Sequence, residues 1–368
     1  MNEIELTQEL VRINSENPPG NERAIAKYIK DFLDDLKIPT EIIEFEKNRF
    51  DVVASIGSGK GLMLNGHMDT VPAGDINNWK YDPFEARIVD GKIFGRGTSD
   101  MKGGIASILA AVKNLSKENF KKKLLLTFVA DEEVALKGSE YLIKNRKGIF
   151  KDIKYGVVAE CNNLNLTIAQ KGIVHLKVKF KGKAAHGSRP ESGDNAIYKA
   201  ADFIQEIRKL IEQLKKRRNV ILGSGTINIG TINGGTKINV VPDFCDVEVD
   251  RRTIPGETSD YAIKQIRKIL KKLKLKADIE IEASCRLPMQ FSDKLEIIKL
   301  IKSITKVKMI GSSGYDEAEL YYRDAGIPSV TLGPGISNQA HVADEYIPIK
   351  NLQKATNIYE QLIRRVCL

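Results

Sequence analysis

The sequence has few cysteines and no long apolar run. Its four cysteines are widely separated and form no Cys-x-x-Cys pair, which excludes a disulfide framework and a structural zinc knot. No apolar stretch is long enough to span a bilayer, and the acidic, amphipathic start at residues 1–13 lacks the basic and apolar regions of a signal peptide. We therefore expect a cytoplasmic protein with no membrane partner.

Aromatic residues are missing from the basic clusters of this chain, whose net charge is +10. The clusters at 121–123, 215–218 and 271–276 fall on expected helix ends or polar helix faces. A platform for single-stranded nucleic acid needs aromatic side chains between the basic ones. The sequence therefore argues against a nucleic-acid partner, and its abundant Lys, Glu and Ile fit a heat-adapted surface.

Apolar strands alternate with helices over residues 1–172. Helical spacing covers 3–12, 22–36 and the small-residue segment 103–115, and strand candidates lie at 51–56, 61–64, 124–129 and 155–158. These strands carry Val, Ile and Leu on both faces and are separated by helices. The pattern predicts an α/β fold with a mostly parallel sheet sandwiched by helices.

The pattern changes near Gly172. Residues 173–180 alternate between apolar and polar, as expected for a sheet with one wet face. Further segments predict helices at 195–214 and 259–275 and strands at 225–232, 247–252 and 277–283. Two helices among four antiparallel strands indicate an inserted α+β domain at 173–287, between the two parts of a first domain at 1–172 and 288–368. Two domains also suit a chain of 368 residues.

Five polar residues stand where apolar runs break into loops. They are His67, Asp100, Glu133, Glu160 and His341. Buried strands that end in carboxylates and imidazoles bring such groups to one edge of a sheet. Two imidazoles and three carboxylates suit a pair of zinc or cobalt ions better than calcium or magnesium. The sequence therefore predicts a two-metal hydrolase.

The local motifs support this prediction to different degrees. In an extended segment His67 and Asp69 point the same way, so Asp69 can accept a hydrogen bond from the ring nitrogen that holds no metal. Four glycines at 95–104 give the backbone around Asp100 unusual freedom. The three adjacent acids at 131–133 repel one another unless a cation compensates them. Taken alone, the first motif also fits a polar turn and the last an exposed acidic turn.

Together, these motifs resemble the ArgE/DapE/carboxypeptidase family of co-catalytic zinc metallopeptidases and deacylases. The shared features are GHMDTVP, GRGTSDMKGG, ADEE, a later Glu and a late His, and their order extends over essentially the whole chain. The resemblance implies that Asp100 bridges two ions, that Glu132 is the general base with Asp69 behind His67, and that a cis peptide follows Asp100. The other implied ligands are His67 and Glu160 on one ion, and Glu133 and His341 on the other.

The chain departs from the family pattern at Cys161, where the family usually has proline. This thiol either contributes to the site or is a small loop residue. In the insert, the segment 182–190 resembles one whose histidine, here His186, crosses a dimer interface to the partner's active site. The resemblance therefore implies a homodimer in which the insert is a dimerisation and lid domain.

Three residues are expected to bind the substrate. Asn239 and Arg252 resemble the pair that holds a substrate carboxylate, and a guanidinium fork fits a carboxylate through two parallel hydrogen bonds. Arg251 points to the opposite face of the strand, so the spacing favours Arg252. Gly333 is expected to shape the pocket floor near His341.

The predicted function is hydrolysis of an N-acyl amino acid in amino-acid metabolism, as by acetylornithine deacetylase or succinyl-diaminopimelate desuccinylase. A metal-bridged hydroxide would attack the amide, with Glu132 as base. A carboxypeptidase or dipeptidase that cleaves short peptides is the alternative, because the ligand set does not separate these activities. A non-catalytic metal-binding paralogue is disfavoured by the presence of Glu132 and His186.

Overall fold

The computed structural model describes residues 1–282 and 285–368. The chain divides into two compact units. Unit 1 comprises Met1–Ile168, Ser292–Met309 and Asp316–Leu368, and unit 2 comprises Ala169–Phe291 and Ile310–Tyr315. The first division lies close to the change of sequence pattern near residue 172.

Unit 1 is built on a mixed sheet in the order β1-β2-β6-β3-β7-β17-β8. The strands are β1 (Thr40–Glu46), β2 (Arg49–Ile56), β3 (Gly61–His67), β6 (Leu124–Val129), β7 (Ile153–Val158), β8 (Leu166–Gln170) and β17 (Ser329–Thr331). The central strands β6, β3, β7 and β17 are parallel to one another. Every residue of β3 and β6 is buried, as strands covered on both faces require.

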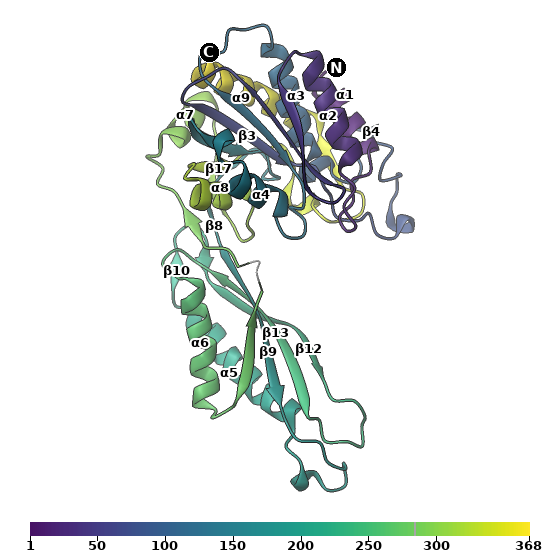
Figure 1. Cartoon of the computed structure of the whole chain (residues 1–368), viewed down its shortest axis with the longest axis vertical. Helices are drawn as coiled ribbons and strands as arrows, with labels where there is room; N and C mark the ends of the chain where they lie inside the picture. The colour runs from purple at the N-terminus through teal and green to yellow at the C-terminus, as the bar shows by residue number, and fades with distance from the viewer. Residues whose placement is uncertain (283–284) are drawn as a thin grey trace. The chain divides into compact units, whose positions relative to one another are not determined.

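Helices cover both faces of this sheet (Figure 1). On one face, α1 (Glu3–Arg12), α3 (Gly103–Leu115) and α9 (Ile349–Cys367) pack against one another, and on the other α4 (Lys137–Asn145) contacts α8 (Glu317–Ala325). The remaining helices of unit 1 are α2 (Arg23–Asp35) and α7 (Glu296–Ile304). The predicted sheet sandwiched by helices is confirmed.

Short elements hold the loops around the sheet edge. A small sheet has the order β18-β5-β4, with β4 (Arg87–Val89), β5 (Lys92–Phe94) and β18 (Tyr346–Pro348). Single turns form η1 (Ile76–Asn78), η2 (Thr98–Lys102), η3 (Lys147–Phe150) and η5 (Ser337–Gln339), and β16 (Met309–Ser312) pairs with β8. The small sheet joins the segment before η2 to the segment before α9, because Phe94 pairs with Tyr346, about 250 residues later in the sequence.

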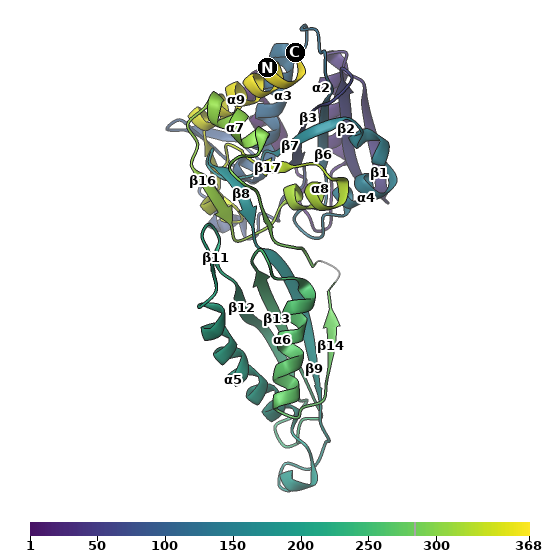
Figure 2. The same cartoon turned by 90° about the vertical axis from the view of Figure 1, so that its left-hand side faces the viewer.

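Unit 2 contains a four-stranded antiparallel sheet in the order β12-β13-β9-β14, covered on one face by two helices (Figure 2). Its main elements are β9 (Gly172–Lys181), α5 (Ala196–Leu214), β12 (Thr226–Gly234), β13 (Phe244–Thr253), α6 (Ser259–Lys272) and β14 (Ala277–Ile281). Shorter elements are η4 (Pro190–Ser192), β10 (Arg218–Asn219), β11 (Gly223–Ser224) and β15 (Met289–Gln290). The predicted strand at 277–283 ends at Ile281, and residue 283 lies outside the described residues.

The two faces of the unit 2 sheet differ in polarity. Alternate side chains of β9, including Val178 and Phe180, are buried in the core beneath α5 and α6. The intervening positions carry polar groups, and Lys177 Nζ lies 3.3 Å from Glu248 Oε1 on β13. The predicted insert of four strands and two helices, with one wet sheet face, is confirmed.

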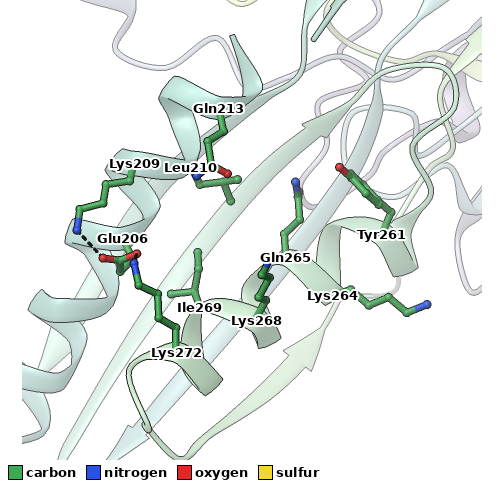
Figure 3. A pocket seen from close by; sticks show the side chains of 10 residues that line it. All are labelled: Glu206, Lys209, Leu210, Gln213, Tyr261, Lys264, Gln265, Lys268, Ile269 and Lys272. Atoms are coloured by element: carbon green, nitrogen blue, oxygen red, sulfur yellow. Dashed lines mark hydrogen bonds and ion pairs between the residues drawn. The ribbon is translucent and has the colours of Figure 1, made fainter. Parts of the chain in front are cut away.

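The excess positive charge of the chain resides in unit 2, which contains 24 Lys and Arg residues and 14 Asp and Glu residues. Lysines rim a groove of about 610 Å³ between α5 and α6 (Figure 3). Within it, Glu206 lies 2.6 Å from Lys209 and 2.5 Å from Lys272. These lysines follow the polar faces of the two helices.

Throughout the part of the chain that the structure describes, each helix is too short or too polar to cross a membrane.

Candidate metal centre

The five polar residues at the ends of apolar runs converge at one edge of the unit 1 sheet. His67 is the last residue of β3, and Glu133 and Glu160 follow the ends of β6 and β7. These strands are parallel neighbours, so their carboxyl ends lie side by side. The turn before α3 supplies Asp100, and the loop before β18 supplies His341.

Asp100 lies between the two imidazoles. Its Oδ1 atom is 3.1 Å from His67 Nε2, and its Oδ2 atom is 3.4 Å from His341 Nε2. Glu160 Oε1 is 3.0 Å from the same atom of His67, and Glu133 Oε2 is 3.0 Å from that of His341. Two ligands of one tetrahedral zinc ion lie about 3.3 Å apart, given bond lengths of about 2.0–2.2 Å. The separations therefore fit a set of donors that would hold metal ions.

The electrostatics of the cluster also fit bound cations. Burial raises the pKa of Glu160 to about 7; the Asp100 carboxylate adds to this rise and His67 opposes it. Burial likewise raises the pKa of Glu132 well above its ordinary value, although His67 opposes this rise too. Several buried carboxyl groups in one place favour compensation by positive charge. Two divalent ions would supply that charge, so the donor set fits them.

The adjacent residues Glu132 and Glu133 diverge. Glu133 reaches His341, whereas Glu132 Oε2 lies 4.0 Å from His67 Nε2. The main-chain N–H groups of both glutamates donate to the Asp69 carboxylate at 3.3 Å. Asp69 thereby holds the turn that directs the two side chains to different places.

Asp69 also lies behind His67, as expected. The nearer contact of the imidazole is with the main-chain oxygen of Asp69, and its carboxylate lies farther away. His67 Nδ1 is 2.9 Å from the Asp69 main-chain oxygen and 3.5 Å from its Oδ1. The Asn17 amide donates to the carboxylates of Asp69 and Asp131 at 2.8 and 3.1 Å, and Arg49 donates to Asp131 at 3.0 Å. The sequence gives no signal for these contacts of Asn17, because the two prolines that follow it indicate only a break in the helical pattern.

The turn that carries Asp100 has an unusual backbone. The Asp100–Met101 peptide bond is cis, as the resemblance implies. Close by, the Cys161 thiol lies within 4.8 Å of ligand atoms of Asp100 and Glu160. Burial raises the pKa of this thiol, and the two carboxylates add to the rise. The Cys161 main-chain N–H donates to Glu160 Oε2 at 2.9 Å, so its backbone helps to hold that carboxylate.

Gly333 lies against the loop that carries Glu160. Its N–H donates to Asn162 Oδ1 at 3.1 Å, and a Cβ at this position would overlap the main-chain oxygens of Ala159 and Glu160. The absence of a side chain therefore lets the β17 end approach the β7 end. The structure places Gly333 behind a candidate ligand; a role in substrate binding stays a prediction.

We expect Gly333→Ala to destabilise the protein by about 1–3 kcal/mol, because the overlapping atoms belong to the backbone and must shift. The displaced Glu160 loop should also weaken zinc binding. Thermal unfolding and zinc titration would measure the two effects. Gly148→Ala is the matched control, since a Cβ there has no described atom within 4 Å. Equal unfolding midpoints for the two variants would contradict the predicted overlap.

Unit 2 brings His186 and Asn239 together. Both side chains are exposed, and the Gly187 N–H donates to the main-chain oxygen of Asn239 at 2.8 Å. His186 and Asn239 lie in loops beyond Lys181 of β9 and before Phe244 of β13, whereas Arg252 lies near the other end of β13, where it pairs with Ile173. The eight residue-to-residue steps from Phe244 to Arg252 span about 27 Å of strand. Asn239 and Arg252 of one chain therefore cannot hold the same carboxylate.

The two adjacent arginines of β13 have different surroundings. Arg251 is buried and donates to Glu257 Oε2 at 3.0 Å. Arg252 is partly exposed on the opposite face, where its Nε donates to Asp250 Oδ1 at 2.8 Å. Of the two guanidinium groups, only that of Arg252 reaches solvent to an appreciable extent.

Comparison with known sequences gives concordant matches. The model of peptidase family M20/M25/M40 matches residues 63–365. A probable succinyl-diaminopimelate desuccinylase of Staphylococcus aureus strain Mu50 is 30% identical over 398 residues, which cover 97% of each chain. An acetylornithine deacetylase of Aliivibrio salmonicida is 30% identical over 355 residues, which cover 95% of this chain and 92% of that protein.

Solved structures share the fold. An M20 family metallo-carboxypeptidase of Sulfolobus solfataricus has a TM-score of 0.81 and 22% identity, with 98% of each chain covered. A dinuclear metal binding peptidase of Bacillus subtilis has a TM-score of 0.73 and 17% identity, with 98% of this chain and 96% of that chain covered. The chain therefore belongs to peptidase family M20/M25/M40 and is a metal-dependent hydrolase that acts on amide bonds.

Proposed function

We propose that the protein is a deacylase that hydrolyses the amide bond of an N-acyl amino acid and releases a carboxylate and a free amino acid. The observation that most supports it is the position of Asp100, whose two oxygens face His67 and His341. The relatives named as desuccinylase and deacetylase, which align with nearly the whole chain, favour this substrate class. Zinc suits the ligands best, with cobalt as the alternative.

Glu132 is the general base in this proposal. When two divalent ions are bound, they supply a water molecule whose pKa is lowered to roughly 7. Glu132 accepts a proton from this water and later donates it to the leaving nitrogen. Asp69 holds the backbone of Glu132, so the carboxylate keeps its position beside the candidate ligands.

We assign unit 2 the role of a dimerisation and lid domain. His186 and Asn239 of one subunit would complete the site of the other, and Arg252 would bind the substrate carboxylate. The distance between Asn239 and Arg252 along β13 supports this arrangement, because in a homodimer the two residues at one site can come from different chains. His186 would donate a hydrogen bond to the developing oxyanion.

A substrate panel tests the proposed function. N-acetyl amino acids, N-succinyl amino acids and dipeptides would be assayed with zinc, with cobalt and after chelation. We expect the highest kcat/KM for an N-acyl amino acid and loss of activity on chelation, with recovery when either metal is restored. Preferred cleavage of dipeptides or of C-terminal residues would instead indicate a dipeptidase or carboxypeptidase. No turnover of any of these compounds with two ions bound would show that the amide substrate lies outside these classes.

A further inference from the structure

Glu345 lies fully buried between the His341 loop and β18. Its carboxylate accepts four hydrogen bonds from one short segment. Arg96 Nη1 and the Gly97 N–H donate to Oε2 at 2.7 and 2.9 Å. The N–H groups of Ser99 and Asp100 donate to Oε1 at 2.7 and 3.1 Å. One buried side chain therefore satisfies three main-chain donors in the turn that carries Asp100.

The chemistry of these contacts selects a carboxylate at this position. All four groups are donors, so each needs an acceptor, and an ionised carboxylate offers acceptors only. Hydrogen bonds to an ionised group are also stronger than those between neutral groups. Two main-chain oxygens add further contacts. The Gly95 N–H donates to the main-chain oxygen of Glu345 at 2.8 Å, and the Ser99 hydroxyl donates to the main-chain oxygen of Tyr346 at 2.8 Å.

Glu345 also connects two candidate ligands. It follows His341 by four residues, and its side chain holds the main-chain N–H of Asp100. Displacement of Glu345 would therefore disturb both the turn of Asp100 and the loop of His341. Asp100 and His341 lie close together, with Asp100 Oδ2 at 3.4 Å from His341 Nε2.

We propose that Glu345 is a positioning residue. It pre-organises the two-ion site by fixing the position of Asp100 relative to His341. The inference rests on the proposed function, since it requires that Asp100 and His341 bind metal. The alternative is a buried ion pair with Arg96 that serves only stability. A purely structural role would lower the unfolding temperature without changing how the folded protein binds metal.

The test uses Glu345→Gln in the full-length protein, with Glu345→Asp as the conservative variant. Glutamine keeps the size but replaces one acceptor oxygen with an amide donor that faces donors. We expect about 10- to 100-fold weaker zinc affinity by competition titration, as for other residues that orient metal ligands. The visible absorption of bound cobalt should also change. Glu345→Asp should have intermediate affinity because it keeps the charge, and it carries the same test if Glu345→Gln does not fold.

Leu33→Ala is the matched stability control. Leu33 is fully buried in α2, and its truncation should destabilise unit 1 by a few kcal/mol and leave zinc affinity unchanged. Parental zinc affinity and cobalt absorption in folded Glu345→Gln would overturn the inference and leave the proposed function intact. A wild-type protein that binds no metal would overturn both.

Discussion

Replacing Glu132 by glutamine is expected to lower kcat by about 10²- to 10⁴-fold while two zinc ions stay bound. An amide of the same size cannot accept the proton from water or return it to the leaving nitrogen. Metal binding should survive, because Glu132 Oε2 lies 4.0 Å from His67 Nε2, whereas Glu160 and Asp100 approach that atom to 3.0 and 3.1 Å. Steady-state kinetics and elemental analysis of the same sample would measure both effects.

The control for this prediction is Glu118→Gln. Glu118 is an exposed acid of unit 1 that pairs with Arg364 at 3.1 Å, so its loss should change neither kcat nor metal content. Turnover of Glu132→Gln at the parental rate would show that another group is the base. Loss of metal from Glu132→Gln would instead make Glu132 a ligand.

The elements with the strongest periodicity were predictable from the sequence. The helix predicted at residues 3–12 has the observed bounds of α1, where Asn2 and Glu5 form a reciprocal cap. Strand β1 was missed because Glu41, Glu44 and Glu46 make it resemble a polar loop. Its place at the edge of the sheet, where a strand has only one neighbour, tolerates these charges.

The convergence of His67, Glu133 and Glu160 was predictable for a topological reason. Residues that follow neighbouring parallel strands must lie at the same sheet edge, however far apart they are in sequence. Asn17 and Glu345 were not predictable in this way, because their partners are Asp side chains and main-chain N–H groups from distant segments.

The predicted substrate-binding residues differ from the candidate metal ligands, because two of them are predicted to act in the site of a second subunit. His186 and Asn239 are exposed on one chain, and their predicted partner groups belong to a second copy. A single sequence shows the residues but not the chain that uses them. The question therefore requires an experiment that separates contributions within one chain from contributions between chains.

His186→Ala is expected to lower kcat by about 10²- to 10³-fold, the usual cost of removing one oxyanion donor. A heterodimer of a His186→Ala subunit and a Glu132→Gln subunit should regain about half of the parental activity, because one of its two symmetric sites then has both groups. Differently tagged subunits allow this heterodimer to be purified from coexpressed chains. Its kcat per dimer would be compared with those of the two inactive homodimers.

The matched control pairs His186→Ala with Asn239→Ala. Gly187 N–H holds the Asn239 oxygen, so His186 and Asn239 of one chain should enter the same site together. Each site of that heterodimer would then lack one of the two groups, and we expect no recovery above the level of the parent variants. If the His186→Ala and Glu132→Gln pair also showed no recovery, His186 would act within its own chain. The shared site would then be wrong, whereas the assignment of Glu132 as base would stand on its own test.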